Sequence, residues 1–310
     1  MSDRPLRYPT CVGPSLSWPE RYAKALALYY PMSQTYKATG INLKAMPLGE
    51  TDRLLTILTP EIGLVRAVAP GSRKHQSRLG GRSDLFVINE CLVVKGKRLD
   101  KLIQAETVRT FPGLSRHLSR LTASQYLAEV VLLMALSDSP QSDLFHVFVE
   151  HLERLETASS GAVLAALCHG LYHLLALSGV APEVHRCTLS RNEIVPNLLD
   201  PAWRVEFSSE AGGLIQTDGA TQLGEGQGHY GQPTKRPLLL TATDVALLQQ
   251  LTKPEILSTL PMGLESPSSQ TGKTQQLWAR VERLLREYTE NYFERPIRSA
   301  ALVDVCLATL

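Results

Sequence analysis

Short runs of alternating apolar and polar residues fill the chain between positions 34 and 112. Such alternation predicts β-strands, and turn residues separate the runs. Five strands in so short a segment predict a small antiparallel barrel of the oligonucleotide-binding (OB) type, although an SH3-like barrel would show the same pattern. The five runs are TYKATGINLKAM, RLLTILT, LVRAVAP, DLFVINECLVVKG and KLIQAETVRT.

After Pro112 the apolar period changes from two to about 3.6, which predicts an α-helical domain over residues 113–310. Its first helix is expected to be capped by Thr122 or Ser124. The segment SGAVLAALCHGLYHLLALSGVAP is apolar on nearly all sides, so we expect a buried central helix that ends at Gly179. The fold class is therefore α+β and multidomain.

Two regions depart from these patterns. Residues 1–33 are rich in proline and lack a convincing period, which predicts a loosely attached or disordered extension, or a functional start at Met32. Residues 187–240 read as short strands followed by a Gly/Gln-rich loop over 217–236. Helices resume at TATDVALLQQLTK, with Thr241 or Thr243 as the expected cap.

Composition narrows the class of protein. The 310 residues are 44% hydrophobic and 20% charged, which is typical of a soluble globular chain. No run of about 18 consecutive apolar residues predicts a membrane span. The cysteines are odd in number and widely spaced, so we expect no disulfide framework and a reducing, cytoplasmic location. The five are Cys11, Cys91, Cys168, Cys187 and Cys306.

The small net charge of +2 hides a strong segregation of charge. Residues 36–120 hold 15 Lys or Arg against 7 Asp or Glu, whereas residues 121–310 hold 13 against 21. A basic barrel followed by an acidic helical domain indicates that the barrel binds a polyanion. The alternative is that these charges are ordinary solvated faces.

The basic residues of the barrel gather in two glycine-containing connections, between the third and fourth strands and between the fourth and fifth. Gly allows close approach of a phosphate backbone, and Lys or Arg replaces its condensed counterions. Stacking partners are sparse (Tyr36, Phe86 and Phe111), so we expect binding that does not read sequence. The candidate DNA-binding residues are Arg66, Arg73, Lys74, Arg78, Arg82, Lys95, Lys97, Arg98 and Lys101.

No catalytic constellation can be argued from the sequence. His169 and His173 have the i, i+4 spacing of zinc ligands, but no Glu completes an HExxH motif, which favours core or helix-end histidines. TGKT at 271–274 is not a phosphate loop, because Pro267 stands where that motif needs Gly and no strand precedes it. We expect no catalytic residue, no metal and no cofactor.

Three stretches resemble the RecO family of DNA repair and recombination proteins. They are GETDRLLTILTPEIGLVRAVAPGSRKHQSRLGG (49–81), PGLSRHLSRLTASQYLAEVVLLMAL (112–136) and LLALSGVAPEVHRC (174–187). The resemblance covers most of residues 34–187. It implies an N-terminal OB domain, a helical C-terminal domain and, in many members, a small zinc module that begins at the position of Cys187. Here Ser190 replaces the second thiolate, so we expect a degenerate zinc-ribbon-like insert that keeps its strands but binds no zinc.

The resemblance also implies a function without bond-breaking chemistry. RecO-like proteins of the RecF pathway bind single- and double-stranded DNA, anneal complementary strands and, with RecR, help load RecA. They also contact the acidic tail of single-stranded-DNA-binding protein, for which Arg280, Arg283 or Arg286 could form a basic rim. A cytoplasmic, nucleoid-associated location follows, without a membrane partner.

Two other classes of function remain open at this point. A metal-dependent enzyme would use His169, His173 and neighbouring carboxylates, and the purified protein would then carry stoichiometric metal. An RNA-binding OB module would prefer RNA to DNA of equal length.

Overall fold

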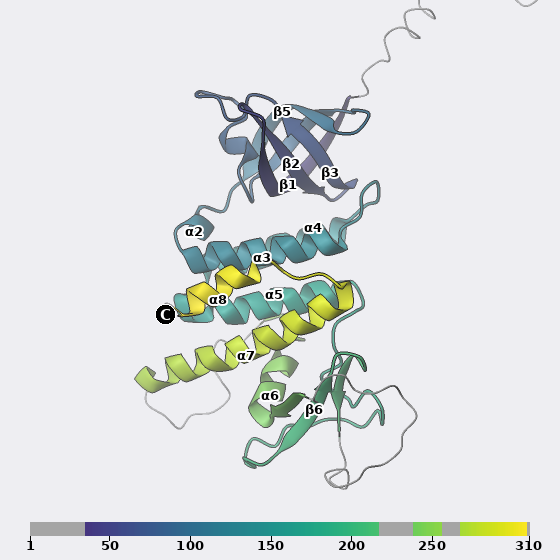
Figure 1. Cartoon of the computed structure of the whole chain (residues 1–310), viewed down its shortest axis with the longest axis vertical. Helices are drawn as coiled ribbons and strands as arrows, with labels where there is room; N and C mark the ends of the chain where they lie inside the picture. Colours follow the sequence, from purple (N-terminus) through teal and green to yellow (C-terminus); the bar gives the residue numbers. More distant parts are fainter. Residues whose placement is uncertain (1–34, 217–237, 256–266, 309–310) are drawn as a thin grey trace, which may run out of the picture.

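The structure, a computed structural model, describes residues 35–216, 238–255 and 267–308. Figure 1 shows a β-barrel at one end of the long axis, a stack of helices in the middle and a small sheet at the other end. The expected extension over 1–33, including Met32, and the expected loop over 217–236 lie outside the described residues.

The N-terminal strands close into a barrel in the order β1-β2-β3-β5-β4. β1 pairs with β4 through its first half and with β2 through its second, while β3 and β5 run parallel. A closed five-stranded barrel with this connectivity confirms the OB prediction. The strands are β1 (Thr35–Leu48), β2 (Asp52–Thr59), β3 (Gly63–Ala69), β4 (Ile88–Val94) and β5 (Asp100–Arg109).

Alternation along the strands fills the barrel and leaves its charged residues outside. On β3, Val65, Ala67 and Ala69 are buried, whereas Arg66 between them is exposed. The two alanines leave room for the larger inner side chains of neighbouring strands, such as Leu55 of β2. The period of two that predicted the strands therefore also decides which side chains can meet a ligand.

The rest of the described chain is mainly helical, as predicted. The central helix α5 contacts α3, α4 and α7, and it ends before Gly179, which has a φ of +72°. The surface of α5 is apolar on nearly all sides because neighbouring helices cover it on several sides. The helices are α2 (Pro112–Ser115), α3 (Leu118–Met134), α4 (Ser142–Thr157), α5 (Val163–Leu177), α6 (Ala242–Gln250), α7 (Pro267–Phe293) and α8 (Ala300–Ala308), with 3-10 turns η1 (Gly81–Ser83) and η2 (Ser160–Ala162).

The expected cap of α3 was wrong. The helix begins at Leu118, after an extended His117, so Thr122 and Ser124 lie inside it and are buried. Their hydroxyls donate to the carbonyls of Ser119 (3.1 Å) and Arg120 (2.9 Å), the backward bonding that lets these residues stay within a helix. For α6 the prediction of Thr241 is confirmed, because Thr241 and Asp244 form a reciprocal capping box.

The small sheet has the order β7-β6-β8 and is antiparallel. Its strands are β6 (Arg204–Ser208), β7 (Gly213–Ile215) and β8 (Leu238–Thr241). The expected strands within 187–240 are thus present. β8 runs directly into α6, which joins this sheet to the helical stack.

Backbone hydrogen bonds join the barrel to the helices. The turn between β2 and β3 lies against the connection between α3 and α4, where the N–H of Leu64 donates to Leu136 O at 2.8 Å. The N–H groups of Ser139 and Gln141 donate back to Ile62 O (3.0 Å) and Pro60 O (2.8 Å). We call these paired segments, residues 60–64 and 136–141, the interdomain seam. It works as a short β-ladder between two domains.

Apolar side chains continue the seam. Ile41 and Leu58 of the barrel belong to the same buried cluster as Phe148 of α4, and Phe86 lies 6.4 Å from the Phe148 ring, centroid to centroid. Each of these large side chains contributes about 1.5–3 kcal/mol when removed from water. The barrel is therefore seated on α3 and α4, and this part of its surface is closed to any ligand.

Among the described residues, one segment is long and apolar enough to cross a membrane, Ser160–Leu177. It comprises η2 and α5, and 67% of it is buried inside the molecule. Its apolar character is accounted for by its place at the centre of the helical stack.

Replacing Gly63 by Ala should weaken the interdomain seam. Gly63 has a φ of +80°, and a Cβ there would lie 2.1 Å from Leu136 O. Backbone strain and this overlap together should lower the free energy of unfolding by about 3 kcal/mol, measured by urea denaturation.

Gly49→Ala is the matched control. Gly49 has a similar φ of +63°, but nothing lies within 4 Å of its Cβ position, so only strain of about 1–2 kcal/mol is expected. Equal losses in the two variants would contradict the importance of the contact with Leu136.

Candidate nucleic-acid interface

The connection between β3 and β4, residues 70–87, carries the first group of basic residues and is tied down at its start. The Arg73 N–H donates to Thr51 O (2.9 Å) and its guanidinium donates to Gly49 O (3.0 Å). Both acceptors belong to the turn between β1 and β2. Two connections of the barrel are thus held together at one end.

Asp52 also bonds to both of these connections. Its carboxylate accepts from the N–H of Gly71 and from the hydroxyl of Thr51, both at 2.8 Å. These bonds, with the positive charges of Lys74 and Lys101 nearby, hold the pKa of the Asp52 carboxyl below its usual range. Lys74 comes from the connection after β3 and Lys101 from the start of β5, so one residue of each basic group predicted from sequence acts electrostatically on Asp52.

The far half of residues 70–87 is equally constrained. Arg53 of β2 forms an ion pair with Asp84 at 2.7 Å. The amides of Asn42 (2.8 Å) and Asn89 (2.9 Å) both donate to the carbonyl of Arg82. Arg82 in turn donates through its guanidinium to Arg78 O and is half-buried. It therefore supports the fold of this connection as well as carrying a positive charge.

The connection between β4 and β5, residues 95–99, forms the second basic group. Asp100 shapes it by accepting from the N–H of Gly96 (3.0 Å) and the hydroxyl of Tyr36 (2.5 Å). Burial and this carboxylate raise the pKa of Tyr36, so its hydroxyl stays protonated as a donor. Lys97 and Arg98 are exposed at the tip of the turn.

All nine candidate residues belong to the barrel, and eight are exposed, with Arg82 as the exception. Arg66 lies on β3, whereas Lys101 lies in β5, opposite Val68 of β3, rather than in the turn before it. Lys95 is 3.6 Å from Asp138 at the interdomain seam, so its charge is partly met within the chain. Sequence reasoning missed Asp52, which joins the two basic groups.

The outer face of β1, β4 and β5 has the opposite charge. Glu90 and Glu106 are direct cross-strand partners, and with Glu61 and Lys37 they line a shallow groove. Like charges placed opposite one another repel, and a phosphate backbone would add to that repulsion. The barrel therefore has a cationic and an acidic side.

The expected scarcity of stacking partners is confirmed for the three aromatic residues considered. Phe86 and Phe111 are 3% and 6% exposed, since both lie in the core beneath the barrel. Tyr36 is half-buried and bonded to Asp100. None of the three offers a free face on which a base could stack.

The residues around Cys187 do not fit the four-ligand zinc site that many RecO-like proteins carry. The Cys187 sulfur accepts from the N–H groups of Ser190 (3.4 Å) and Gln216 (3.3 Å), as a thiolate ligand in a zinc ribbon would. Of the described residues of this region, Cys187 is the one thiol, and His185 contacts Thr252 instead. One sulfur cannot replace four ligands.

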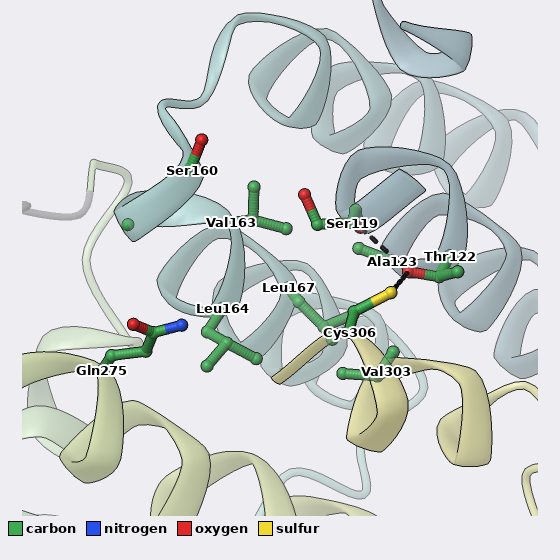
Figure 2. A pocket seen from close by; sticks show the side chains of 11 residues that line it. Ser119, Thr122, Ala123, Ser160, Val163, Leu164, Leu167, Gln275, Val303 and Cys306 are labelled. Atoms are coloured by element: carbon green, nitrogen blue, oxygen red, sulfur yellow. Dashed lines mark hydrogen bonds between the residues drawn. The ribbon is translucent and has the colours of Figure 1, made fainter. Parts of the chain in front are cut away.

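A small recess of about 20 Å³ lies between α3, α5, α7 and α8 and is too small for an apolar peptide tip (Figure 2). None of its lining residues is charged. Of the three arginines considered for a basic rim, Arg280 bonds to Asp244 at 2.9 Å and Arg286 bonds to Asp304 and Glu282, whereas Arg283 is exposed. The lining residues are Ser119, Thr122, Ala123, Ser160, Gly161, Val163, Leu164, Leu167, Gln275, Val303 and Cys306.

Histidines form a cluster that the sequence did not reveal in full. His169 and His173 of α5 lie beside His151 of α4, and one nitrogen of each lies within 4.8 Å of the others. The i, i+4 spacing pointed to the first two only, because His151 is on another helix. The TGKT segment lies within α7, which agrees with its exclusion as a phosphate loop.

Comparison with known proteins gives a consistent result. The chain matches the family descriptions "Recombination protein O N terminal" over residues 32–111 and "Recombination protein O C terminal" over residues 115–301. It is 49% identical over 287 residues to the DNA repair protein RecO of Gloeothece citriformis, covering 88% of this chain and 98% of that protein. The RecO proteins of Trichodesmium erythraeum (46% over 289 residues; 90% and 97% covered) and Nostoc punctiforme (46% over 300; 88% and 96%) are similarly close. With both domains matched and relatives aligned over almost their whole length, this chain belongs to the recombination protein O family of DNA repair proteins.

Proposed function

We propose that the barrel binds the phosphate backbone of single- and double-stranded DNA through its cationic side, without reading sequence. The observation that carries this proposal is that the end of β3 runs beside the start of β5, which brings the basic connection after β3 and the one before β5 to the same end of the barrel. Hydrogen bonds hold both connections in place, so little conformational freedom is lost on binding. Lys and Arg neutralise phosphates whatever the base sequence.

Annealing of complementary strands follows from the same surface. Two strands repel one another through their phosphates, and a cationic surface that binds both lowers that repulsion. Because Phe86 and Phe111 are buried and Tyr36 is bonded to Asp100, these three aromatic residues do not hold the bases, which stay free to pair with the other strand. The protein would act by positioning DNA, with no bond broken and no catalytic residue.

The partners follow from membership of the family. With RecR, the chain would help to load RecA on DNA covered by single-stranded-DNA-binding protein, and it would be located at the nucleoid. An excess of Asp and Glu after residue 120 keeps DNA away from the helical domain and leaves that domain for protein contacts. The recess of Figure 2 has a volume of about 20 Å³, room for about one water molecule, so the apolar tip of the binding protein's tail needs another site on this domain.

Replacing Lys74, Arg78, Lys97 and Arg98 together by Ala should weaken DNA binding equally for all sequences. These four side chains are exposed and make no hydrogen bond or ion pair to other described residues, so the fold should persist. Each lost phosphate contact removes about 0.7–0.9 from the slope of log K against log salt, or up to about 3 in total. Fluorescence anisotropy across a salt series measures this slope.

The control removes the same charge from the acidic domain. Arg186, Arg283, Arg295 and Arg298 are also exposed, and replacing them by Ala should leave the slope nearly unchanged. Equal changes in the two variants would show that overall charge, not the barrel surface, drives binding. A clear preference for RNA over DNA of equal length would favour the RNA-binding alternative.

Annealing of two complementary labelled oligonucleotides should be accelerated by the protein without ATP. The rate should fall steeply with salt, because released counterions drive binding, and EDTA should not change it. Fluorescence quenching on pairing gives the rate directly. Loss of activity in EDTA would instead favour the metal-dependent enzyme.

A further inference from the structure

The histidine cluster joins α4 to α5 inside the helical domain. His151 and His169 are fully buried and His173 is partly exposed. The ring centroids of His169 and His173 are 4.0 Å apart, and those of His151 and His173 are 5.0 Å apart. Three imidazoles in mutual contact are an unusual core, because each carries polar nitrogens that packing alone does not satisfy.

The spacing of their nitrogens suits a shared ion. Nε2 of His151 and Nδ1 of His173 lie 3.1 Å apart and share a hydrogen bond in the metal-free chain. In a tetrahedral zinc site with bonds of about 2.05 Å, neighbouring ligand atoms lie about 3.3 Å apart. The third nitrogen, from His169, is within 4.8 Å of both, close enough for a rotamer adjustment to bring it to the same ion.

The hydrogen bonds of His169 also suit a metal. A neutral imidazole has the free lone pair that a metal requires. Nε2 of His169 faces the carbonyl of Lys253 at 2.8 Å and must donate to it, which leaves the Nδ1 lone pair as the ligand.

A positive charge already occupies this place. The guanidinium of Arg154 donates to Nδ1 of His169 at 2.8 Å, and its other nitrogen is paired with Glu150. The carbonyl of Lys253, just beyond the end of α6, adds a partial negative charge on the opposite side. Arg154 therefore occupies the Nδ1 lone pair of His169 and opposes a second positive charge, so an ion can bind only when this guanidinium turns away.

We propose that His151, His169 and His173 bind a divalent ion such as zinc. Arg154 gives up its hydrogen bond to Nδ1 of His169 when the ion binds. Imidazole nitrogens are ligands that zinc, nickel and cobalt share, and the partly exposed His173 gives the ion its way in. The ion would clamp α4 to α5 as a structural element. It is distinct from the degenerate region around Cys187 and takes no part in DNA binding.

The test uses the tag-free, full-length chain stripped of metal with EDTA and then dialysed. Calorimetric titration with zinc chloride should give one equivalent bound at micromolar or better affinity, with magnesium chloride as the inactive control. Zinc at about 100 times its Kd should raise the melting temperature by about 5 °C. Cobalt chloride should give the visible absorption of a tetrahedral site.

Variants assign the ligands. His173→Gln, at the partly exposed position, should fold normally and bind zinc at least about tenfold more weakly. Arg154→Gln should bind zinc more tightly, because the competing charge is gone. His146→Gln, at an exposed position of α4, and Cys187→Ser should bind as the unaltered chain does.

Three results would overturn the proposal. They are the absence of stoichiometric zinc, zinc binding that is lost in Cys187→Ser but retained in His173→Gln, and weaker binding in Arg154→Gln. In any of these cases the cluster is a polar part of the core. DNA annealing by His173→Gln should match that of the unaltered chain, so failure here is distinct from failure of the DNA-binding proposal.

Discussion

The structure depends on the way in which the barrel is seated on the helices. At the interdomain seam, N–H groups of the β2–β3 turn and of the α3–α4 connection find their acceptors across the domain boundary. These hydrogen bonds between partly exposed segments each contribute about 0.5–1.5 kcal/mol. The apolar cluster around Phe86 and Phe148 closes the remaining gap. A barrel fixed in this way keeps its cationic side in a constant position, as the proposed DNA binding requires.

The same arrangement divides the barrel surface by function. Ile41 and Leu58 are buried where the barrel contacts α3 and α4. Glu90 and Glu106 make the outer face of β4 and β5 repulsive to phosphate. The side that carries Lys74 and Lys101 is the one proposed to bind a polyanion. Asp52 is an acidic residue at the centre of a basic surface, and it holds the β1–β2 turn and the loop after β3 in register. The arrangement of these two connections depends on the negative charge of Asp52.

The sequence predicted the barrel well because the information was local. Alternation on β3 separates Arg66 from Val65 and Ala67, and turn residues mark the strand ends. The same local information failed at α3, where Thr122 and Ser124 look like caps but are buried and bond backwards along the helix. Hydroxyl residues serve both purposes, and tertiary burial decides between them.

Contacts between distant segments could not be predicted from one sequence. His169 and His173 share a helix face, so their spacing was visible, but His151 reaches them only because α4 packs on α5. In the same way, nothing in the order of residues paired Arg280 with Asp244 or Arg286 with Asp304, so two of the three arginines considered for a basic rim have partners within the chain. These outcomes depend on helix packing and not on any motif.

Lysine labelling tests directly whether DNA binds the cationic side of the barrel. The protein, free and bound to a single-stranded oligonucleotide, is treated with an amine-reactive reagent, and mass spectrometry measures the modification of each lysine. The account predicts that DNA protects Lys74, Lys97 and Lys101, whereas Lys37 on the acidic side is modified equally in both states. Protection of Lys37 with continued modification of Lys74 and Lys101 would place the DNA on another face and contradict the account.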